Sequence, residues 1–106
     1  MADVDFQQLS SVQSSNSPAS RPQTIASAAT IAPTGFHTFV SGTVQVATVT
    51  PFVSGTHLIF LTFTNAAPGA LLTSGNLITA YQPIQNRPIG FLWDPVGAKY
   101  YQLAVV

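Results

Sequence analysis

The stretch His57-Leu-Ile-Phe-Leu-Thr-Phe63 does most to decide the fold of this chain. Its aliphatic and aromatic residues favour a strand, and successive side chains of a strand point to opposite faces. Leu58 and Phe60 therefore share one face, and the other face carries Ile59, Leu61 and Phe63. Both faces are apolar, whereas a half-exposed strand of a monomer alternates with polar residues. The pattern predicts a strand covered on both faces, by a second layer of the same chain or by a neighbouring molecule.

The rest of the chain after residue 23 repeats the strand pattern. In Pro88-Ile-Gly-Phe-Leu-Trp-Asp94, alternation places Ile89, Phe91 and Trp93 on one face. Short runs rich in Val, Ile, Thr and Phe, separated by Gly, Pro, Asn and Ser, predict further strands. The predicted strands are 24–31, 36–40, 43–50, 57–64, 70–73, 76–81, 88–93 and 98–105. No segment has a helical period with caps, so the predicted fold is all-β, a small antiparallel sandwich or roll or a prism-like domain.

The N-terminal segment differs in character from the rest of the 106 residues. Residues 1–23 are rich in Ser, Gln and Asn and have few apolar groups to offset the entropy of ordering. We predict an extended, flexible arm over 1–23 and a β domain over 24–106. The arm is either a disordered tail or a segment that orders on a partner. In the second case Phe6 and Leu9, spaced i and i+3, are its apolar anchors.

Charge is nearly absent from the chain. Residues 22–86 contain no Asp, Glu, Lys or Arg, and the whole protein has three acidic and three basic residues. Average soluble domains are about 25% charged. Charge keeps a surface wet and keeps sheet edges apart, so we expect this domain to self-associate or to be covered by neighbours in a particle. A net charge of zero argues against nucleic acid or an acidic membrane as a partner.

Few side chains are suited to catalysis. His37 and His57 are the only histidines, and Asp94 is the only carboxylate outside the arm. The chain has no cysteine, which excludes disulfides and thiolate chemistry. Asp94 before Pro95 is typical of a turn. We expect each histidine to be hydrogen-bonded on a strand, although three copies of one histidine would suffice to hold a cation on a trimer axis. The sequence therefore predicts no enzyme, no cofactor and no metal.

Aromatic residues gather around the last predicted turn. Trp93, Tyr100 and Tyr101 flank it on both sides. A cross-strand aromatic pair that closes a hairpin is the favoured interpretation. The alternative is a set of exposed rings that stack on a glycan.

Five segments of the β domain form a recognisable series: Thr24-Ile-Ala-Ser-Ala-Ala-Thr-Ile-Ala-Pro-Thr34, Phe39-Val-Ser-Gly-Thr43, Val46-Ala-Thr-Val-Thr-Pro51, Leu72-Thr-Ser-Gly-Asn76, and Phe91-Leu-Trp-Asp94 with Lys99-Tyr-Tyr101. The series covers nearly all of 24–103 and resembles a recurrent β-domain of tailed-bacteriophage virion proteins. That domain occurs in capsid decoration or head-fibre proteins and in tail fibres and spikes. This chain departs from the pattern at the last turn, where Pro95 and Val96 extend the loop.

The resemblance implies a trimeric, non-enzymatic component of the virion surface. Our first hypothesis is a capsid decoration (cement) protein, assembled in the host cytoplasm, that trimerises on the phage head and binds the major capsid protein through its arm. Leu61, Phe63 and Trp93 are then expected in the core or at the contact between subunits. The alternative is a receptor- or glycan-binding protein at a tail fibre or tail tip. A hydrolase is disfavoured, because no catalytic constellation is present.

Overall fold

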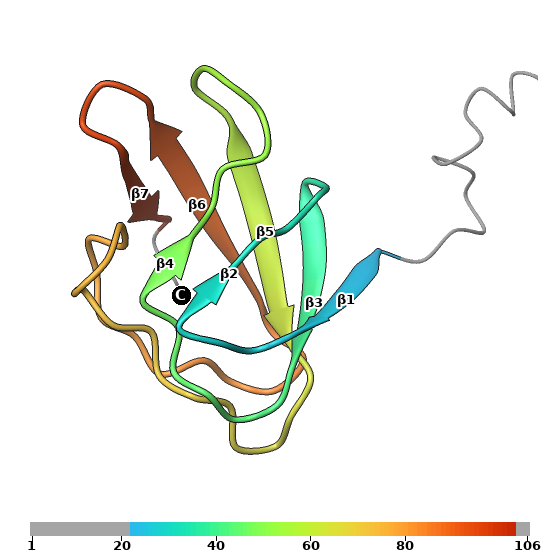
Figure 1. Cartoon of the computed structure of the whole chain (residues 1–106). Helices are drawn as coiled ribbons and strands as arrows, with labels where there is room; N and C mark the ends of the chain where they lie inside the picture. The colour runs from blue at the N-terminus through green and yellow to red at the C-terminus, as the bar shows by residue number, and fades with distance from the viewer. Residues whose placement is uncertain (1–21, 104–106) are drawn as a thin grey trace, which may run out of the picture.

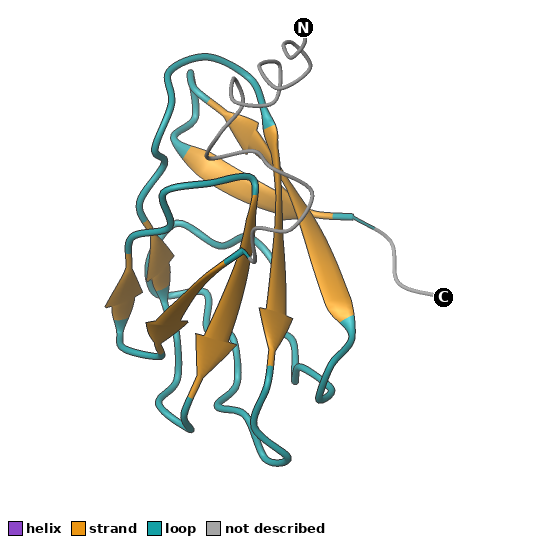
Figure 2. Cartoon of the chain, turned by 90° about the vertical axis from the view of Figure 1, so that its right-hand side faces the viewer, coloured by secondary structure: helices purple, strands orange, loops and turns teal. Residues whose placement is uncertain are grey.

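The computed structural model describes residues 22–103 and shows two β layers with no helix in that range (Figure 1). The larger layer is a five-stranded sheet of order β1-β3-β5-β6-β7. Its strands are β1 (Gln23–Ala26), β3 (His37–Ser41), β5 (Leu58–Phe63), β6 (Pro88–Asp94) and β7 (Lys99–Gln102). The smaller sheet pairs β2 (Thr30–Ile31) with β4 (Thr48–Val49), and it lies on one side of the larger sheet (Figure 2). The all-β prediction is confirmed.

The larger sheet is mixed, so the antiparallel prediction is wrong for half of it. β1 and β3 are parallel, as are β3 and β5, whereas β5–β6 and β6–β7 are antiparallel. The reason lies in the connections. From β1 to β3 the chain passes through β2, and from β3 to β5 it passes through β4. Each excursion through the second layer returns the chain to the same end of the sheet, which makes the next strand parallel.

The strands predicted at 36–40, 57–64, 88–93 and 98–105 are confirmed with shifted ends. The segment 24–31 is instead divided, because the chain leaves the larger sheet after β1 and joins β4 through β2. Within 43–50 only β4 and a single bridge at Val46 form, and 70–73 and 76–81 likewise pair through isolated bridges. These bridges link Val46 to Leu71, Leu71 to Tyr81, and Leu77 to Tyr100.

The hydrophobic core lies between the two layers. One face of the larger sheet supplies Val40, Ile59, Leu61, Phe63, Ile89, Phe91, Trp93 and Tyr100. The second layer supplies Ile31, Val46, Val49, Leu71 and Leu77. The predicted alternation of Ile89, Phe91 and Trp93 toward one buried face is therefore confirmed.

The turn Ser74-Gly75-Asn76 fastens the second layer to the last strand of the sheet. The Asn76 side-chain amide donates from Nδ2 to the Val49 carbonyl at 2.7 Å and accepts at Oδ1 from the Val49 N–H at 2.9 Å. The Asn76 carbonyl accepts from the Tyr100 N–H at 2.8 Å. One residue thus completes the free edge of β4 with its side chain and contacts β7 with its backbone.

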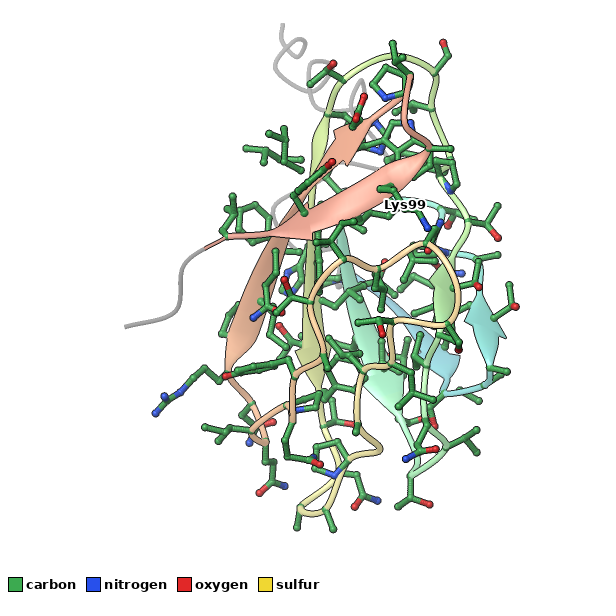
Figure 3. The ribbon with its side chains drawn as sticks, turned by 90° about the vertical axis from the view of Figure 1, so that its left-hand side faces the viewer. Lys99 is labelled. Carbon is green, nitrogen blue, oxygen red and sulfur yellow. The ribbon has the colours of Figure 1, made fainter. Side chains whose placement is uncertain are left out.

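Gly75 and Lys99 complete this joint. A Cβ atom at Gly75 would overlap the Thr48 hydroxyl and the Ala47 carbonyl, so only glycine lets the turn approach β4 this closely. The Lys99 Nζ atom donates to the Gly75 carbonyl at 3.0 Å (Figure 3). The side chain of the single lysine of the chain therefore links β7 to this turn.

Candidate functional site

The candidate site is the face of the larger sheet that points away from the core, which we call the outer face. Its centre is a patch of five large residues: Leu58, Phe60, Leu92, Tyr101 and Leu103. Each of the five is between 38% and 44% exposed. Inward-pointing residues of the same strands, such as Leu61 and Phe91, are almost completely buried. One face of the sheet is thus covered by the chain itself, and the other is apolar and open.

Strand register brings the patch together from three strands. Leu58 of β5 lies opposite Leu92 of β6, and Leu92 lies opposite Tyr101 of β7. Phe60 lies opposite Gly90 in the adjacent row. Leu103 reaches this second row, because its N–H donates to the Gly90 carbonyl at 2.8 Å.

Gly90 makes the patch continuous. A Cβ atom there would lie 2.6 Å from Leu103 Cδ1 and 3.0 Å from Phe60 Cε1. These two side chains therefore close over the bare backbone of β6. An isolated glycine within a strand is typical of a close approach, so Gly90 is a sequence signal that could have located the site, although it was not used to predict one.

The patch is large for a domain of this size. Five side chains of Leu, Phe and Tyr, each about two-fifths exposed, present roughly 400 Å² of accessible surface. Monomeric soluble proteins rarely expose contiguous apolar patches larger than a few hundred Å². The patch falls within the roughly 300–600 Å² of the largest apolar patch on a typical monomer, and such a patch is often functional.

None of the three Asp, Glu, Lys or Arg residues in 22–103 belongs to the patch. Asp94 accepts at Oδ1 from the Val96 N–H at 3.0 Å, which confirms its predicted role in the turn. Lys99 is engaged with Gly75, and Arg87 lies in the loop before β6. The five residues of the patch therefore carry no charge. Asp94 and Lys99 lie next to Leu92 and Tyr101 along the same strand faces, and a histidine lies at the border on the β3 side.

That histidine is His37, which lies on β3 next to Phe60. Its Nε2 atom is 2.8 Å from the Thr62 hydroxyl, and its ring meets that of Phe39 edge-on with centroids 5.1 Å apart. The predicted role as a hydrogen-bonded strand residue is confirmed. His37 supplies a polar border to the patch on the β3 side.

His57 is held at the end of the sheet, among aromatic rings. Its Nδ1 atom lies 2.8 Å from the Gly55 carbonyl and its Nε2 atom 3.0 Å from the Tyr100 hydroxyl. A carbonyl can only accept, so Nδ1 donates to Gly55, and in the Nδ1–H tautomer Nε2 accepts from the Tyr100 hydroxyl. Burial raises the pKa of the Tyr100 hydroxyl to about 12. This arrangement accounts for His57 as a structural residue.

The predicted aromatic pair across the last hairpin is confirmed. Trp93 lies opposite Tyr100, with ring centroids 4.6 Å apart. Trp93 is 8% exposed and Tyr100 is 1% exposed, so neither presents a ring face to a sugar. Tyr101 alone of the three is exposed, and it belongs to the patch.

The other predicted site residues fall in two groups. Leu61 and Phe63 lie in the core of the single chain, as Trp93 does. Phe6 and Leu9 lie outside the described residues. Among residues 22–103, no group of three His, Cys, Asp or Glu side chains is placed to hold a metal ion.

Comparison with known proteins gives no family and no function for this chain. No family model matches the chain, and neither the curated proteins nor the solved structures give a match. In the part of the chain that the structure describes, no helix is long and apolar enough to cross a membrane.

Proposed function

We propose that this protein is a structural component of a tailed-bacteriophage virion, a decoration (cement) protein of the capsid. In this proposal homotrimers bind the major capsid protein on the outside of the head and stabilise the shell. The single observation that carries the proposal is the apolar patch on the outer face of the sheet, made of five residues without charge, which one chain leaves open. Such a surface is unfavourable in water and suits a protein that works packed against neighbours.

The polar side chains support a structural role. His37, His57 and Asp94 are each engaged in hydrogen bonds within the fold. A hydrolase needs a base that is oriented by a third group and faces a substrate. His57 instead accepts from a buried tyrosine. The sequence motifs of residues 24–103 resemble those of phage virion domains. This resemblance supports the proposal and is the source of the number of three subunits.

In the proposed mechanism the β domain and the arm have different roles. The β domain holds the trimer together, and the arm of each subunit binds the capsid through Phe6 and Leu9. Each anchor contributes about 1.5–3 kcal/mol when fully buried, before the cost of ordering the arm. Three arms on one trimer act together through effective concentration, so weak single contacts are sufficient for firm attachment.

The test is binding of purified protein to undecorated phage shells. Deletion of residues 1–21 removes nearly all of the predicted arm of residues 1–23. It keeps Gln23, which begins β1 and whose Oε1 accepts from the Thr34 N–H and hydroxyl. We expect the truncated protein to remain a trimer, with three times the mass of the shortened chain by light scattering, and to lose shell binding. Phe6→Ala with Leu9→Ala should weaken binding strongly, whereas the control Gln7→Ala with Gln8→Ala should not.

Two results would count against the proposal. Full occupancy of shells by the truncated protein would place attachment on the β domain. Electron microscopy that finds the protein only in the tail, in few copies per virion, would favour the tail-fibre alternative. For a glycan-binding tip, the burial of Trp93 and Tyr100 leaves Tyr101 as the exposed ring among the three around the last turn.

A further inference from the structure

We infer that the outer face of the larger sheet is the surface through which copies of this chain contact one another. The occupant of the patch formed by Leu58, Phe60, Leu92, Tyr101 and Leu103 is thus the outer face of neighbouring copies of this chain. The inference rests on the proposed function only for the number of copies. In a trimer, three outer faces meet around the symmetry axis.

The absence of charge argues for a second copy. A partner that brought a charged side chain onto this patch would bury it without a counter-ion, which is unfavourable. The partner surface must therefore be neutral and apolar as well. The outer face of another copy meets this requirement, and soluble oligomers are mostly closed, symmetric assemblies of one chain.

The geometry of the patch is that of the inner face of a β-sandwich. Sheets pack face to face about 10 Å apart through alternate apolar side chains. One row of such side chains consists of Leu58, Leu92 and Tyr101. The adjacent row consists of Phe60 and Leu103, which cover Gly90. The roughly 400 Å² of the patch is about half of the 800 Å² per partner in a standard interface. An apolar centre of that size, bordered by a polar rim, matches the usual anatomy of an interface.

The edge next to the patch argues for packing by faces. The backbone of β7 is already paired on its outer side, because Tyr100 N–H donates to the Asn76 carbonyl and the Tyr100 carbonyl accepts from the Ile78 N–H. A neighbouring strand therefore cannot extend the sheet at β7. Copies that meet on this side of the molecule therefore contact each other through the side chains of the outer face and do not pair strand to strand at β7.

The first test introduces a charge on the patch of the full-length protein. Leu92→Lys and Tyr101→Lys should raise the concentration at which half of the protein is assembled by roughly 100-fold or more, because lysine at the centre of an apolar contact has no partner. Ile84→Lys is the matched control, since Ile84 is 47% exposed in a loop outside the patch. Light scattering measures the mass, and circular dichroism checks that each variant is folded.

A second measurement avoids charged variants that fail to fold. The chain has no cysteine, so Leu92→Cys and Val96→Cys each introduce a single thiol. Val96 is 95% exposed in the β6–β7 turn. In assembled protein we expect the thiol at position 92 to react with a maleimide at least about tenfold more slowly than the thiol at position 96. After dilution below the assembly range, the two rates should approach each other.

The outcomes separate this inference from the proposed function. Equal labelling rates in a trimeric sample would overturn the inference, because copies would then meet elsewhere, and would leave the proposed function standing. A wild-type monomer at micromolar concentration that still decorates shells would overturn the inference and the trimeric part of the proposed function, and would leave shell decoration standing. Trimers that depend on Leu92 and Tyr101 but are not found on phage heads would support the inference and contradict the proposed function.

Discussion

Replacement of Asn76 by Asp would test how the two layers of the fold are joined. In the wild-type protein the Asn76 amide donates to the Val49 carbonyl at 2.7 Å and accepts from the Val49 N–H at 2.9 Å. The substitution preserves the size of the side chain and its acceptor. It replaces the donating nitrogen with an oxygen that faces the Val49 carbonyl.

The expected cost follows from one lost hydrogen bond and one buried group left without a partner. Val49 is fully buried, so water does not readily replace the lost donor. A lost hydrogen bond costs about 1 kcal/mol and an unsatisfied buried carbonyl about 1–3 kcal/mol. We therefore expect the free energy of unfolding to fall by about 2–4 kcal/mol. In a domain of this size that lowers Tm by at least about 8 °C.

The loss should depend on pH. A protonated carboxyl regains a donor for the Val49 carbonyl, so the folded state favours the protonated form and raises the pKa of the introduced group. The usual pKa is about 3.9. The destabilisation is therefore small below about pH 4 and grows as the pH rises through the raised pKa of the folded state. At about pH 3 the variant should lie much closer to the wild-type protein than at pH 7.

Thermal unfolding followed by the fluorescence of Trp93, the only tryptophan, is a suitable assay. Asn65→Asp is the matched control, because Asn65 uses Oδ1 to accept from the Ala67 N–H at 2.8 Å and a carboxylate keeps that acceptor. The control should change stability by less than about 0.5 kcal/mol. If Asn76→Asp lowers Tm no more than Asn65→Asp, the side chain of Asn76 does not join the layers as described.

Two further predictions concern the core. Leu61→Asp or Phe63→Asp should prevent folding, because an unpaired buried carboxylate costs several kcal/mol against a total stability of about 5–15 kcal/mol. Ile84→Asp, at an exposed position, should fold, and soluble wild-type-like protein from either core variant would contradict the assignment. Alkaline pH should also destabilise the protein, because burial raises the pKa of Tyr100 from 10.0 to about 12 and the folded state therefore holds this proton more tightly. Stability from this group is fully present below about pH 10 and should fall by about 2–3 kcal/mol as the pH rises to about 12. Urea unfolding against pH measures this decline, which Tyr100→Phe should lack.

The sequence by itself determined the features that depend on local pattern. The alternation in 57–63 and 88–94 identified two central strands, and in 88–94 it also identified the residues that face the core. The turn at Asp94 and the pairing of Trp93 with Tyr100 followed from turn chemistry and from the short distance along the chain between the two strands. These features need little information beyond their own segment, because side-chain direction in a strand has a period of two and a short hairpin fixes its own register.

The direction and partners of the other strands were decided only by the tertiary structure. Gly and Pro indicate where a strand ends but not the direction or the pairing partner of the next strand. The local sequence therefore does not show that β1, β3 and β5 are parallel. The division of 24–31 between two sheets has the same origin. Asn76 likewise became a joint between layers because Val49 lies beside it, which requires contact across 27 positions of the chain.

The tertiary structure also decided which apolar face of β5 is left open. The local sequence does not distinguish the two faces of β5, since both are hydrophobic. One face carries Leu58 and Phe60, and the other carries Ile59, Leu61 and Phe63. The second layer covers only the row of Leu61, and pairing with β6 and β7 adds Leu92, Tyr101 and Leu103 to the other. Period-two alternation separates two faces of a strand but cannot rank them when both are apolar. That ranking comes from long-range packing, which places the second layer on one side of the sheet.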